Sequence, residues 1–555
     1  MSVKVPSNLE IAQAHELEPI EQVAERYGLE PDEYDLYGRY KAKINLSTIE
    51  RLSSRPDGKL VCVTAITPTK AGEGKTTTAV SLTQGLGTIG KKPALCLREP
   101  SLGPVFGIKG GAAGGGYAQV VPMEDLNLHF TGDIHAIGAA NNLLAAAIDA
   151  HLLHGNSLDI DPLTIEWRRC VDMNDRALRQ TVIGLGGRAN GYPRETGFDI
   201  TAASEIMAIV AVANDLHDLR ARLGAITVAY TRDGEPVTAD DLEAAGAMAV
   251  ILKETLKPNL IQTLEGQACL MHCGPFANIA HGNNSLVADK VALKLGDYVI
   301  TESGFGSDMG MEKFLDIVCR VGELNPSAIV LVATVRALKH HAENPTGDLD
   351  AVERGIENLA RHIRIAHEFG FAPVVAINRR PEDSDEECEL VRRLALERGA
   401  FAAEINDAFA HGGEGAATLA EAVVRACEEP GEFSPLYELD EPIAAKIESI
   451  ATRVYGASGV TFMPAALEKM KRYTETGLER LPICMAKTHL SLSHDPLLVN
   501  APKGFTVPIR DLRAYTGAGW IVALCGDMMT MPGLSATPAL RNVDIDASGT
   551  TVGLF

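Results

Sequence analysis

Residues 60–90 read "LVCVTAITPTKAGEGKTTTAVSLTQGLGTIG" and predict a strand, a glycine-containing turn and a helix in direct succession. The apolar run Leu60–Ile66 is typical of a strand covered on both faces. The helix prediction depends on apolar residues at helical spacing, namely Ala79, Leu82, Leu86 and Ile89. A turn between a strand and a helix N-terminus can bind phosphate through backbone N–H groups and the helix dipole. The segment therefore predicts a nucleotide site in an α/β protein.

The turn "TPTKAGEGK" departs from the usual pattern G-x-x-x-x-G-K-[ST], because Thr69 stands where the pattern has its first glycine. Lys70 offsets this departure, since "KAGEGKT" resembles a variant loop, K-G-G-x-G-K-T, in which an extra lysine also serves the phosphates. We expect the N–H groups of Gly72–Gly74 to face the β-phosphate, Lys75 to bridge terminal oxygens and Thr76 to hold Mg²⁺. The predicted nucleotide-binding residues are Thr69, Lys70, Ala71, Gly72, Glu73, Gly74, Lys75 and Thr76. The alternative is an ordinary glycine-rich turn with a lysine at the helix start.

Apolar runs bounded by turn residues alternate with helix-like segments along most of the chain. This alternation predicts the α/β class, with a P-loop NTPase-like, mostly parallel sheet, helices on both faces and two smaller α/β domains. The strand candidates are Leu60–Ile66, Ala94–Leu97, Ile226–Thr231, Tyr298–Thr301, Ala328–Thr334 and Pro373–Asn378. We expect domains at residues 1–370, 371–457 and 458–555, because the composition changes after Asn378 and again across Glu428–Pro442.

The charge balance is strongly acidic, with 51 Lys and Arg against 73 Asp and Glu, a formal net charge of −22. Such a chain repels nucleic acid and anionic membranes, so neither is an expected partner. We find no basic segment followed by an apolar core at the start, and no run of 18 or more uncharged apolar residues. These features predict a cytoplasmic protein that does not span a membrane.

Arg98 and Glu99 follow the second strand candidate, at the sheet edge where open α/β sheets place their ligands. A guanidinium there can clamp a carboxylate or phosphate, although an isolated Arg–Glu pair can also be a structural salt bridge. The tract "GIKGGAAGGGY" follows, and so much glycine indicates a loop that must approach a ligand closely. Asp133 in "FTGD" is a candidate metal-side carboxylate, with helix capping as the alternative.

Several motifs together resemble the formate–tetrahydrofolate ligase family. They are "REPSLGP", "GIKGGAAGGGY", "FTGD", "GPFANIAHG" (Gly274–Gly282), "ESGFGSDMGMEKF" (Glu302–Phe314) and "VATVRALK" (Val332–Lys339). The resemblance implies a homotetramer that joins formate to tetrahydrofolate, with or without a polyglutamate tail, using ATP with Mg²⁺ and a monovalent cation, K⁺ or NH₄⁺. It also implies a formyl phosphate intermediate, with ADP and phosphate as the other products.

The resemblance assigns roles to particular residues. Lys75 would be catalytic, Arg98 matches the family arginine that grips formyl phosphate, and Glu99 matches an acid tied to the cation response. The metal-side residues would be Thr76, Glu99 and Asp133. Arg380 and Phe409 stand where the family usually has two aromatic residues that stack on the pterin, so residues 371–457 would contribute a folate or adenine slot. Arginine and phenylalanine can still stack on a ring.

Two groups of polar residues are expected to have no ligand role. The cluster "CLMHC" (Cys269–Cys273) lacks the spacing of a zinc site, and the ten cysteines are expected to be reduced and buried. His340 and His341 are expected to be solvated loop residues.

Two other functions remain open at this stage. One is an acyl-phosphate-forming ligase for another small acid, which would share the first half-reaction. The other is a P-loop regulatory ATPase, although the length of this chain and its second glycine tract argue against that function.

Overall fold

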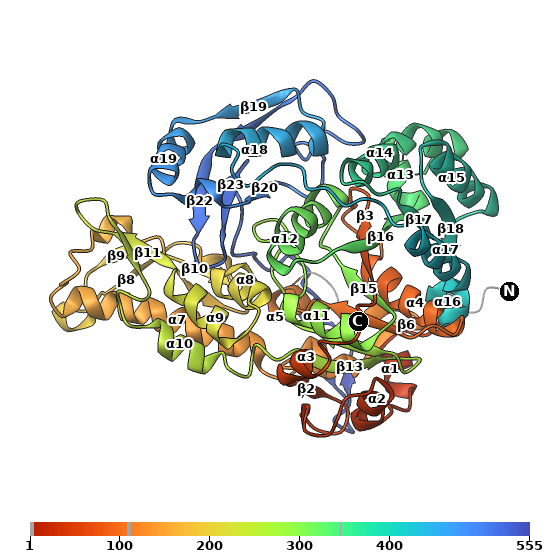
Figure 1. Cartoon of the computed structure of the whole chain (residues 1–555), viewed down its shortest axis with the longest axis horizontal. Helices are drawn as coiled ribbons and strands as arrows, with labels where there is room; N and C mark the ends of the chain where they lie inside the picture. The colour runs from red at the N-terminus through yellow and green to blue at the C-terminus, as the bar shows by residue number, and fades with distance from the viewer. Residues whose placement is uncertain (1–4, 108–112, 345, 555) are drawn as a thin grey trace.

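The computed structural model describes residues 5–107, 113–344 and 346–554. Its main feature is a twelve-stranded sheet with β5 (Gly114–Gly115) and β6 (Ala118–Val121) attached beside β13 (Figure 1). The other strands are, in spatial order, β1 (Tyr34–Leu36), β2 (Ala42–Ile44), β13 (Asn259–Thr263), β14 (Ala268–Met271), β4 (Pro93–Leu97), β15 (Tyr298–Glu302), β3 (Lys59–Ala65), β16 (Pro326–Ala333), β17 (Val374–Asn378) and β18 (Ala402–Asn406). From β14 to β18 all neighbouring pairs are parallel. The mostly parallel sheet is thus confirmed.

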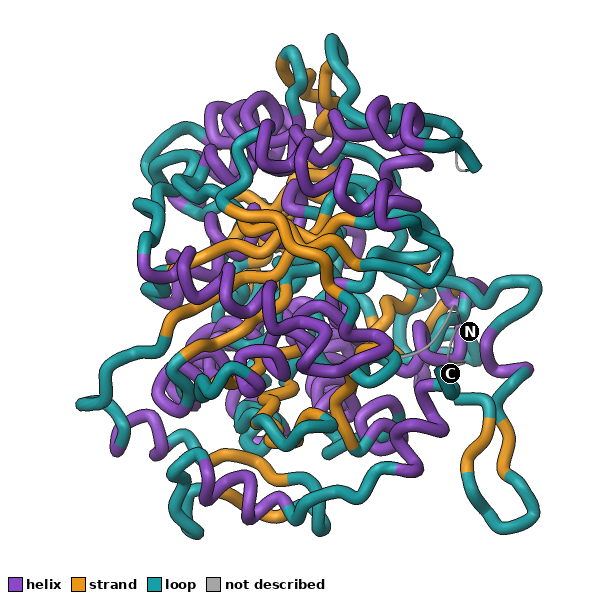
Figure 2. The backbone as a smooth tube through the Cα atoms, turned by 90° about the vertical axis from the view of Figure 1, so that its right-hand side faces the viewer, coloured by secondary structure: helices purple, strands orange, loops and turns teal. Residues whose placement is uncertain are grey.

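Helices cover both faces of this sheet, as the layers of Figure 2 show. In β16 the odd residues Ile329 and Leu331 and the even residues Val330 and Val332 belong to different apolar clusters, because alternate side chains of a strand point to opposite faces. The even face packs on α4 (Lys75–Thr88) and α17 (Ala417–Glu428). The odd face packs on α11 (Leu286–Leu295), α13 (Val335–His341), α14 (Leu349–Glu368) and α15 (Asp385–Glu397).

The remaining α-helices surround this core. They are α1 (Asn8–Ala14), α2 (Ile20–Arg26), α3 (Ser47–Arg51), α5 (Leu102–Gly107), α6 (Met123–Asn127), α7 (Asp133–Leu153), α8 (Glu205–Val212), α9 (Leu216–Gly224), α10 (Ala245–Ile251), α12 (Cys319–Gly322), α16 (Ala408–His411), α18 (Ile443–Ser449) and α19 (Pro464–Glu475). By length and composition α7 could cross a membrane, but Ile137, Leu144 and Ile148 are buried in the main apolar cluster. It is a core helix of this fold.

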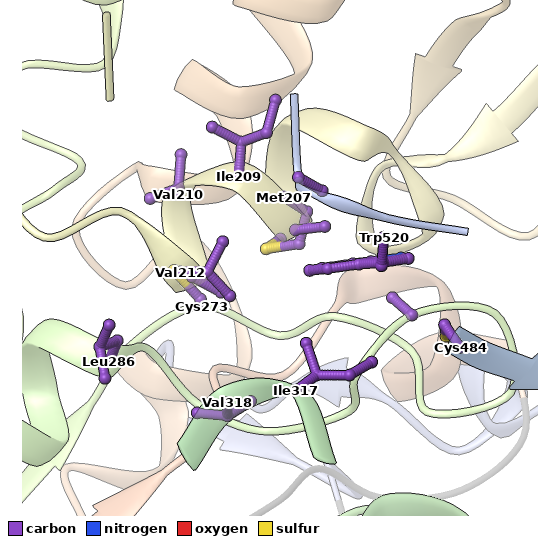
Figure 3. Close-up of a cluster of buried hydrophobic side chains, with 14 of the residues drawn as sticks. Met207, Ile209, Val210, Val212, Cys273, Leu286, Ile317, Val318, Cys484 and Trp520 are labelled. Atoms are coloured by element: carbon purple, nitrogen blue, oxygen red, sulfur yellow. The ribbon is translucent and has the colours of Figure 1, made fainter. Parts of the chain in front are cut away.

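The C-terminal residues form two smaller sheets. One pairs β19 (Gly459–Phe462) with β21 (Thr506–Ile509), and the other has the order β20 (Ile483–Ala486), β23 (Trp520–Leu524), β22 (Asp511–Tyr515). Figure 3 shows Trp520 and Cys484 of this part among side chains of α8 and of the π-helix η6 (Phe314–Val318). All of them are buried in one apolar cluster, so the C-terminal part packs on the main sheet domain through a continuous core.

All six strand candidates contain strands of the structure, but the strand in Ile226–Thr231 lies outside the main sheet. That run contains β11 (Thr227–Tyr230), which pairs antiparallel with β12 (Pro236–Thr238) in a hairpin of its own, outside the main sheet. The Asp233–Gly234 turn between them accounts for this, because Gly234 has φ 91° and closes a local hairpin. The expected boundary after residue 370 falls between β16 and β17, and β17 and β18 both belong to the main sheet.

Candidate active site

The phosphate loop connects β3 to α4 at the centre of the sheet. Thr69 stands where the usual pattern has its first glycine, and the turn still forms. The carbonyl of Thr69 accepts the N–H of Gly72 at 3.0 Å. The N–H of Gly72 thus closes this turn, whereas the expectation has it facing the β-phosphate. Gly74 has φ 76°, and a Cβ there would lie 2.9 Å from Nδ2 of Asn378, so only glycine fits without strain.

The side chain of Glu73 holds the loop together. It is buried, and it accepts the N–H of Thr69 at 2.7 Å and the hydroxyl of Thr334 at 2.5 Å. The carbonyls of Gly72 and Glu73 accept Nη2 of Arg336 at 2.6 Å and Nδ2 of Asn378 at 2.9 Å. Because these carbonyls are bonded to surrounding side chains, the orientation of the loop backbone is fixed before any ligand binds.

Three predicted residues of the loop lie at its outer side or at the helix start. Lys70 is exposed, and the N–H of Ala71 bonds the hydroxyl of Thr69 at 3.3 Å. Lys75 is the first residue of α4, which places its ammonium at the positive end of the helix. The loop thus combines backbone donors with cations, as a phosphate site requires.

One carboxylate joins the loop to the next strands. Glu302, at the end of β15, accepts the hydroxyl of Thr76 at 2.5 Å and Nη2 of Arg98 at 3.1 Å. Arg98 follows β4, and β15 lies between β4 and β3, so three neighbouring strand ends bring these side chains together. They line a cavity of about 210 Å³ together with Glu99, Ser101 and Gly274.

Glu99 is a buried carboxyl on this cavity. Its Oε2 has no hydrogen-bond partner among the described residues. Burial raises the pKa of Glu99 well above its usual range, and the Asp133 carboxylate raises it further, against the lowering effect of Lys43. An unsatisfied buried oxygen beside a polar cavity is consistent with a cation ligand, because a cation would stabilise the ionised form.

Asp133 forms a buried ion pair, whereas the expectation was a carboxylate on the metal side of the site. Both its oxygens bond Nζ of buried Lys43 at 2.8 Å, and Oδ2 also accepts Nδ2 of Asn259 at 2.8 Å. These contacts describe a buried, hydrogen-bonded ion pair. Across the described ranges no three His, Cys, Asp or Glu side chains are grouped to hold a metal. Mg²⁺ is commonly held by one or two protein oxygens together with phosphates and water, and the hydroxyl of Thr76 and the carboxylate of Glu302 are oxygens of this kind.

Arg380 and Phe409 meet at a second cavity. It measures about 200 Å³ and is also lined by Glu73, Gly74 and Asn378, so it adjoins the phosphate loop directly. Nε of Arg380 is buried and has no partner within the described part of the chain. The side chain of Phe409 is 42% exposed. The structure therefore brings both predicted residues to one slot beside the loop.

The described end of the glycine tract packs against Phe409. A Cβ on Gly116 would lie 1.9 Å from the carbonyl oxygen of Phe409, and the N–H of Tyr117 bonds that oxygen at 3.0 Å. The earlier part of the tract, with Lys109, Gly110 and Gly111, lies outside the described residues.

Sequence reasoning missed Glu302, Asn378 and His489. Asn378 bonds the loop and also accepts Nδ2 of Asn406 at 2.8 Å. A signal for this pair existed, because β17 and β18 both end in Ile-Asn and are in register. His489 stacks on Phe305, with ring centroids 4.2 Å apart. Glu302 had a signal too, because it directly follows the strand candidate Tyr298–Thr301 and opens the motif Glu302–Phe314, whereas His489 had none, because its partner Phe305 is distant in the sequence.

The histidine and cysteine predictions have mixed outcomes. All ten cysteines are buried and free, as expected. His272 is buried between Ser285 and the carbonyl of Thr255, both at 2.6 Å, and burial lowers its pKa to about 4. His340 is exposed, but the expectation for His341 was wrong. Its ring is buried and bonds the carbonyl of Thr67 at 2.9 Å, since the last turn of α13 packs on the base of the phosphate loop.

A phosphate loop at the centre of a mostly parallel sheet, with Arg98, Glu99 and Glu302 lining a cavity beside it, defines a nucleotide-binding protein of the P-loop type. A family model described as formate–tetrahydrofolate ligase matches residues 6–555. The formate–tetrahydrofolate ligase of Desulforamulus reducens is 60% identical over 565 residues, covering 100% of both chains. That of Roseiflexus sp. (strain RS-1) is 57% identical, covering 99% of this chain and 100% of its own.

The chain belongs to the formate–tetrahydrofolate ligase family. Its activity is therefore the ATP-dependent formylation of tetrahydrofolate by formate. This result sets aside the regulatory ATPase and the ligase for another acid.

Proposed function

We propose that this ligase works through formyl phosphate and that the Thr76–Glu302–Arg98 cluster is where it forms. The cluster supports this proposal because it places a guanidinium, at 3.1 Å from Glu302, in the cavity next to the phosphate loop. A formate oxygen attacks the γ-phosphorus of ATP, and the bond from that phosphorus to the ADP oxygen breaks. N10 of tetrahydrofolate then attacks the formyl carbon, phosphate leaves, and N10 loses its proton.

The residues act mainly by neutralising charge, because phosphoryl transfer depends on positioning and electrostatics. Lys75 and the loop N–H groups bind the ATP phosphates, and Arg98 orients first formate and then the acyl phosphate. Glu302 fixes the position of Arg98.

The cations of the reaction are assigned to side-chain oxygens of this site. Thr76 and Glu302 would hold Mg²⁺, which neutralises phosphate charge when it is bound. The unsatisfied Oε2 of Glu99 would hold the monovalent cation, K⁺ or NH₄⁺. Asp133 acts in this proposal only through its ion pair with Lys43, at 2.8 Å, near Glu99.

The slot between Arg380 and Phe409 would receive the pterin of tetrahydrofolate, with or without a polyglutamate tail. Its position supports this, because it opens next to Gly74 and would bring N10 close to the phosphate end of the site. A homotetramer and a cytoplasmic location complete the proposal. The homotetramer rests on the family resemblance.

The intermediate is tested by oxygen transfer. With [¹⁸O]formate, MgATP and tetrahydrofolate, one labelled oxygen should appear in the released phosphate, because the attacking formate oxygen stays on phosphorus. Mass spectrometry of the phosphate measures this. Unlabelled phosphate, with full formation of formyl product, would contradict an acyl phosphate route.

A further inference from the structure

The chain segment from Lys487 to Asn500, called here the 487–500 segment, follows β20 and starts at a buried ion pair. Nζ of Lys487 donates to Oδ2 of Asp308 at 2.7 Å, and both side chains are buried. The same ammonium donates to the carbonyls of Ser491 at 2.5 Å and Thr488 at 3.0 Å. Because Asp308 lies in the π-helix η5 (Ser307–Met311) that follows β15, the segment is fixed to the sheet edge that carries Glu302.

The other end of the segment is fixed to the base of the phosphate loop. The N–H of Asn500 donates to Nδ1 of His341 at 3.2 Å, and its carbonyl accepts Nδ2 of Asn358 at 2.7 Å. Both partners also bond Thr67, which lies between β3 and the loop, at 2.9 Å from His341 and 3.0 Å from Asn358. The segment is thus held at both ends to elements that position the loop.

Between these ends, His489 stacks on Phe305. The two rings have centroids 4.2 Å apart and planes 17° apart. Phe305 has φ 59°, a conformation that a bulky side chain rarely adopts, so the surrounding structure must hold its ring in this position. Such strain is common at functional sites, and Phe305 lies three residues after Glu302.

The imidazole of His489 lies in a cationic environment. Burial, together with the ammonium groups of Lys487 and Lys75, lowers its pKa to about 4, while the carboxylate of Asp308 acts in the opposite direction. The ring is therefore neutral at pH 7. Within the described residues its nitrogens form no hydrogen bond, so an N–H is available close to the lysine that binds phosphate.

We infer that the 487–500 segment forms one wall of the ATP site and that His489 donates a hydrogen bond to the terminal phosphate held by Lys75. The inference rests on the proposed binding of ATP phosphates at residues 69–76. An anion at Lys75 accepts the imidazole N–H and offsets the ammonium charge of Lys75, since the ammonium of Lys487 is already paired with Asp308. The C-terminal part of the chain then contributes directly to nucleotide recognition.

The experiment compares two nucleotides on the intact protein by calorimetry. The His489→Ala variant should bind the β,γ-imido analogue of ATP, with Mg²⁺, about ten- to a hundredfold more weakly, because it loses a hydrogen bond to a charged group. Its affinity for MgADP, which lacks the terminal phosphate, should change less than about threefold. His489→Gln keeps a side-chain N–H donor and should recover most of the affinity for the analogue.

His494→Ala is the matched control, because it removes a ring from the same segment, next to Phe505 rather than Lys75. It should bind both nucleotides normally. Unchanged affinity of His489→Ala for the analogue would overturn the inference, and so would an equal loss for MgADP. If the unsubstituted protein bound neither nucleotide, the assignment of residues 69–76 would be wrong, and the inference would fall with it.

Discussion

The hydroxyl of Thr76 donates to the carboxylate of Glu302 at 2.5 Å, although 226 positions separate the two residues. The other oxygen of Glu302 holds Arg98 at 3.1 Å. One carboxylate therefore links the residue expected at Mg²⁺ with the residue expected at formyl phosphate. Substitution of Glu302 should affect both functions at once.

Glu302→Gln keeps the shape of the side chain but removes its charge. We expect kcat to fall by about a hundredfold, because Arg98 loses its ionic partner and the metal loses a ligand. Steady-state rates at saturating formate, with the Mg²⁺ concentration varied, measure both effects. Glu353→Gln on the exposed side of α14 is the control and should behave as the unsubstituted enzyme.

Arg98→Lys keeps a positive charge but loses the planar, forked donor group. We expect kcat to fall at least about tenfold and the KM for formate to rise, because a lysine cannot bind a carboxylate or phosphate through two parallel hydrogen bonds. Calorimetric affinity for MgATP should stay within about threefold. Normal turnover in Arg98→Lys and in Arg98→Ala would exclude the assigned role.

Gly74→Ala should damage both stability and nucleotide binding. Its left-handed backbone costs an alanine about 1–2 kcal/mol, and the new Cβ would lie 2.9 Å from Asn378. Gly90→Ala is a close control, because Gly90 has the same φ of 76° but no atom within 4 Å of the added Cβ. Both variants should melt earlier, and only Gly74→Ala should lose MgATP binding. Equal nucleotide affinity in the two variants would contradict the role of this close contact.

Phe409→Ala should raise the KM for tetrahydrofolate by about tenfold, because stacking on one ring contributes about 1–3 kcal/mol. Arg380→Phe should lower that KM, since an aromatic ring would face Phe409 across the slot. The KM for formate should stay constant in both variants. Leu467→Ala, at an exposed apolar residue of α19, is the control for loss of a large side chain. A KM effect confined to formate would place the folate elsewhere.

His362 makes stability depend on pH. Burial lowers its pKa to about 3 in the folded chain, against about 6.5 when unfolded. Below pH 6.5 the unfolded chain binds a proton that the folded chain does not, so stability is lost as pH falls. His362→Gln removes this titration while keeping a donor and an acceptor for Ser307 and Thr67. The stability difference between the two proteins should shrink by about 2 kcal/mol from pH 7.5 to pH 5. A constant difference in urea unfolding would contradict a neutral His362.

Local patterns predicted the centre of the fold, and non-local contacts account for what was missed. The β3–loop–α4 unit was predictable because its strand, turn and helix are consecutive. His341 was wrongly predicted to be solvated, because its burial depends on Thr67 and Asn500, which are distant in the sequence. The sequence did not show that Ile226–Thr231 lies in a separate hairpin. A short apolar run has the same pattern in a hairpin strand and in a central strand. Arg98 and Glu99 were predictable from their place at a strand end, and the same rule applies to Glu302, but its contact with Arg98 depends on strand order and could not be predicted.

The position of β3 between β15 and β16 has a consequence for synthesis. The ribosome makes β3 early, yet both of its neighbours begin more than two hundred residues later, at Tyr298 and Pro326. At about 5–20 residues per second, a nascent chain therefore carries an unpaired, apolar central strand for about 10–50 s. Chaperone binding near residues 59–65 during translation would protect this strand until its partners emerge.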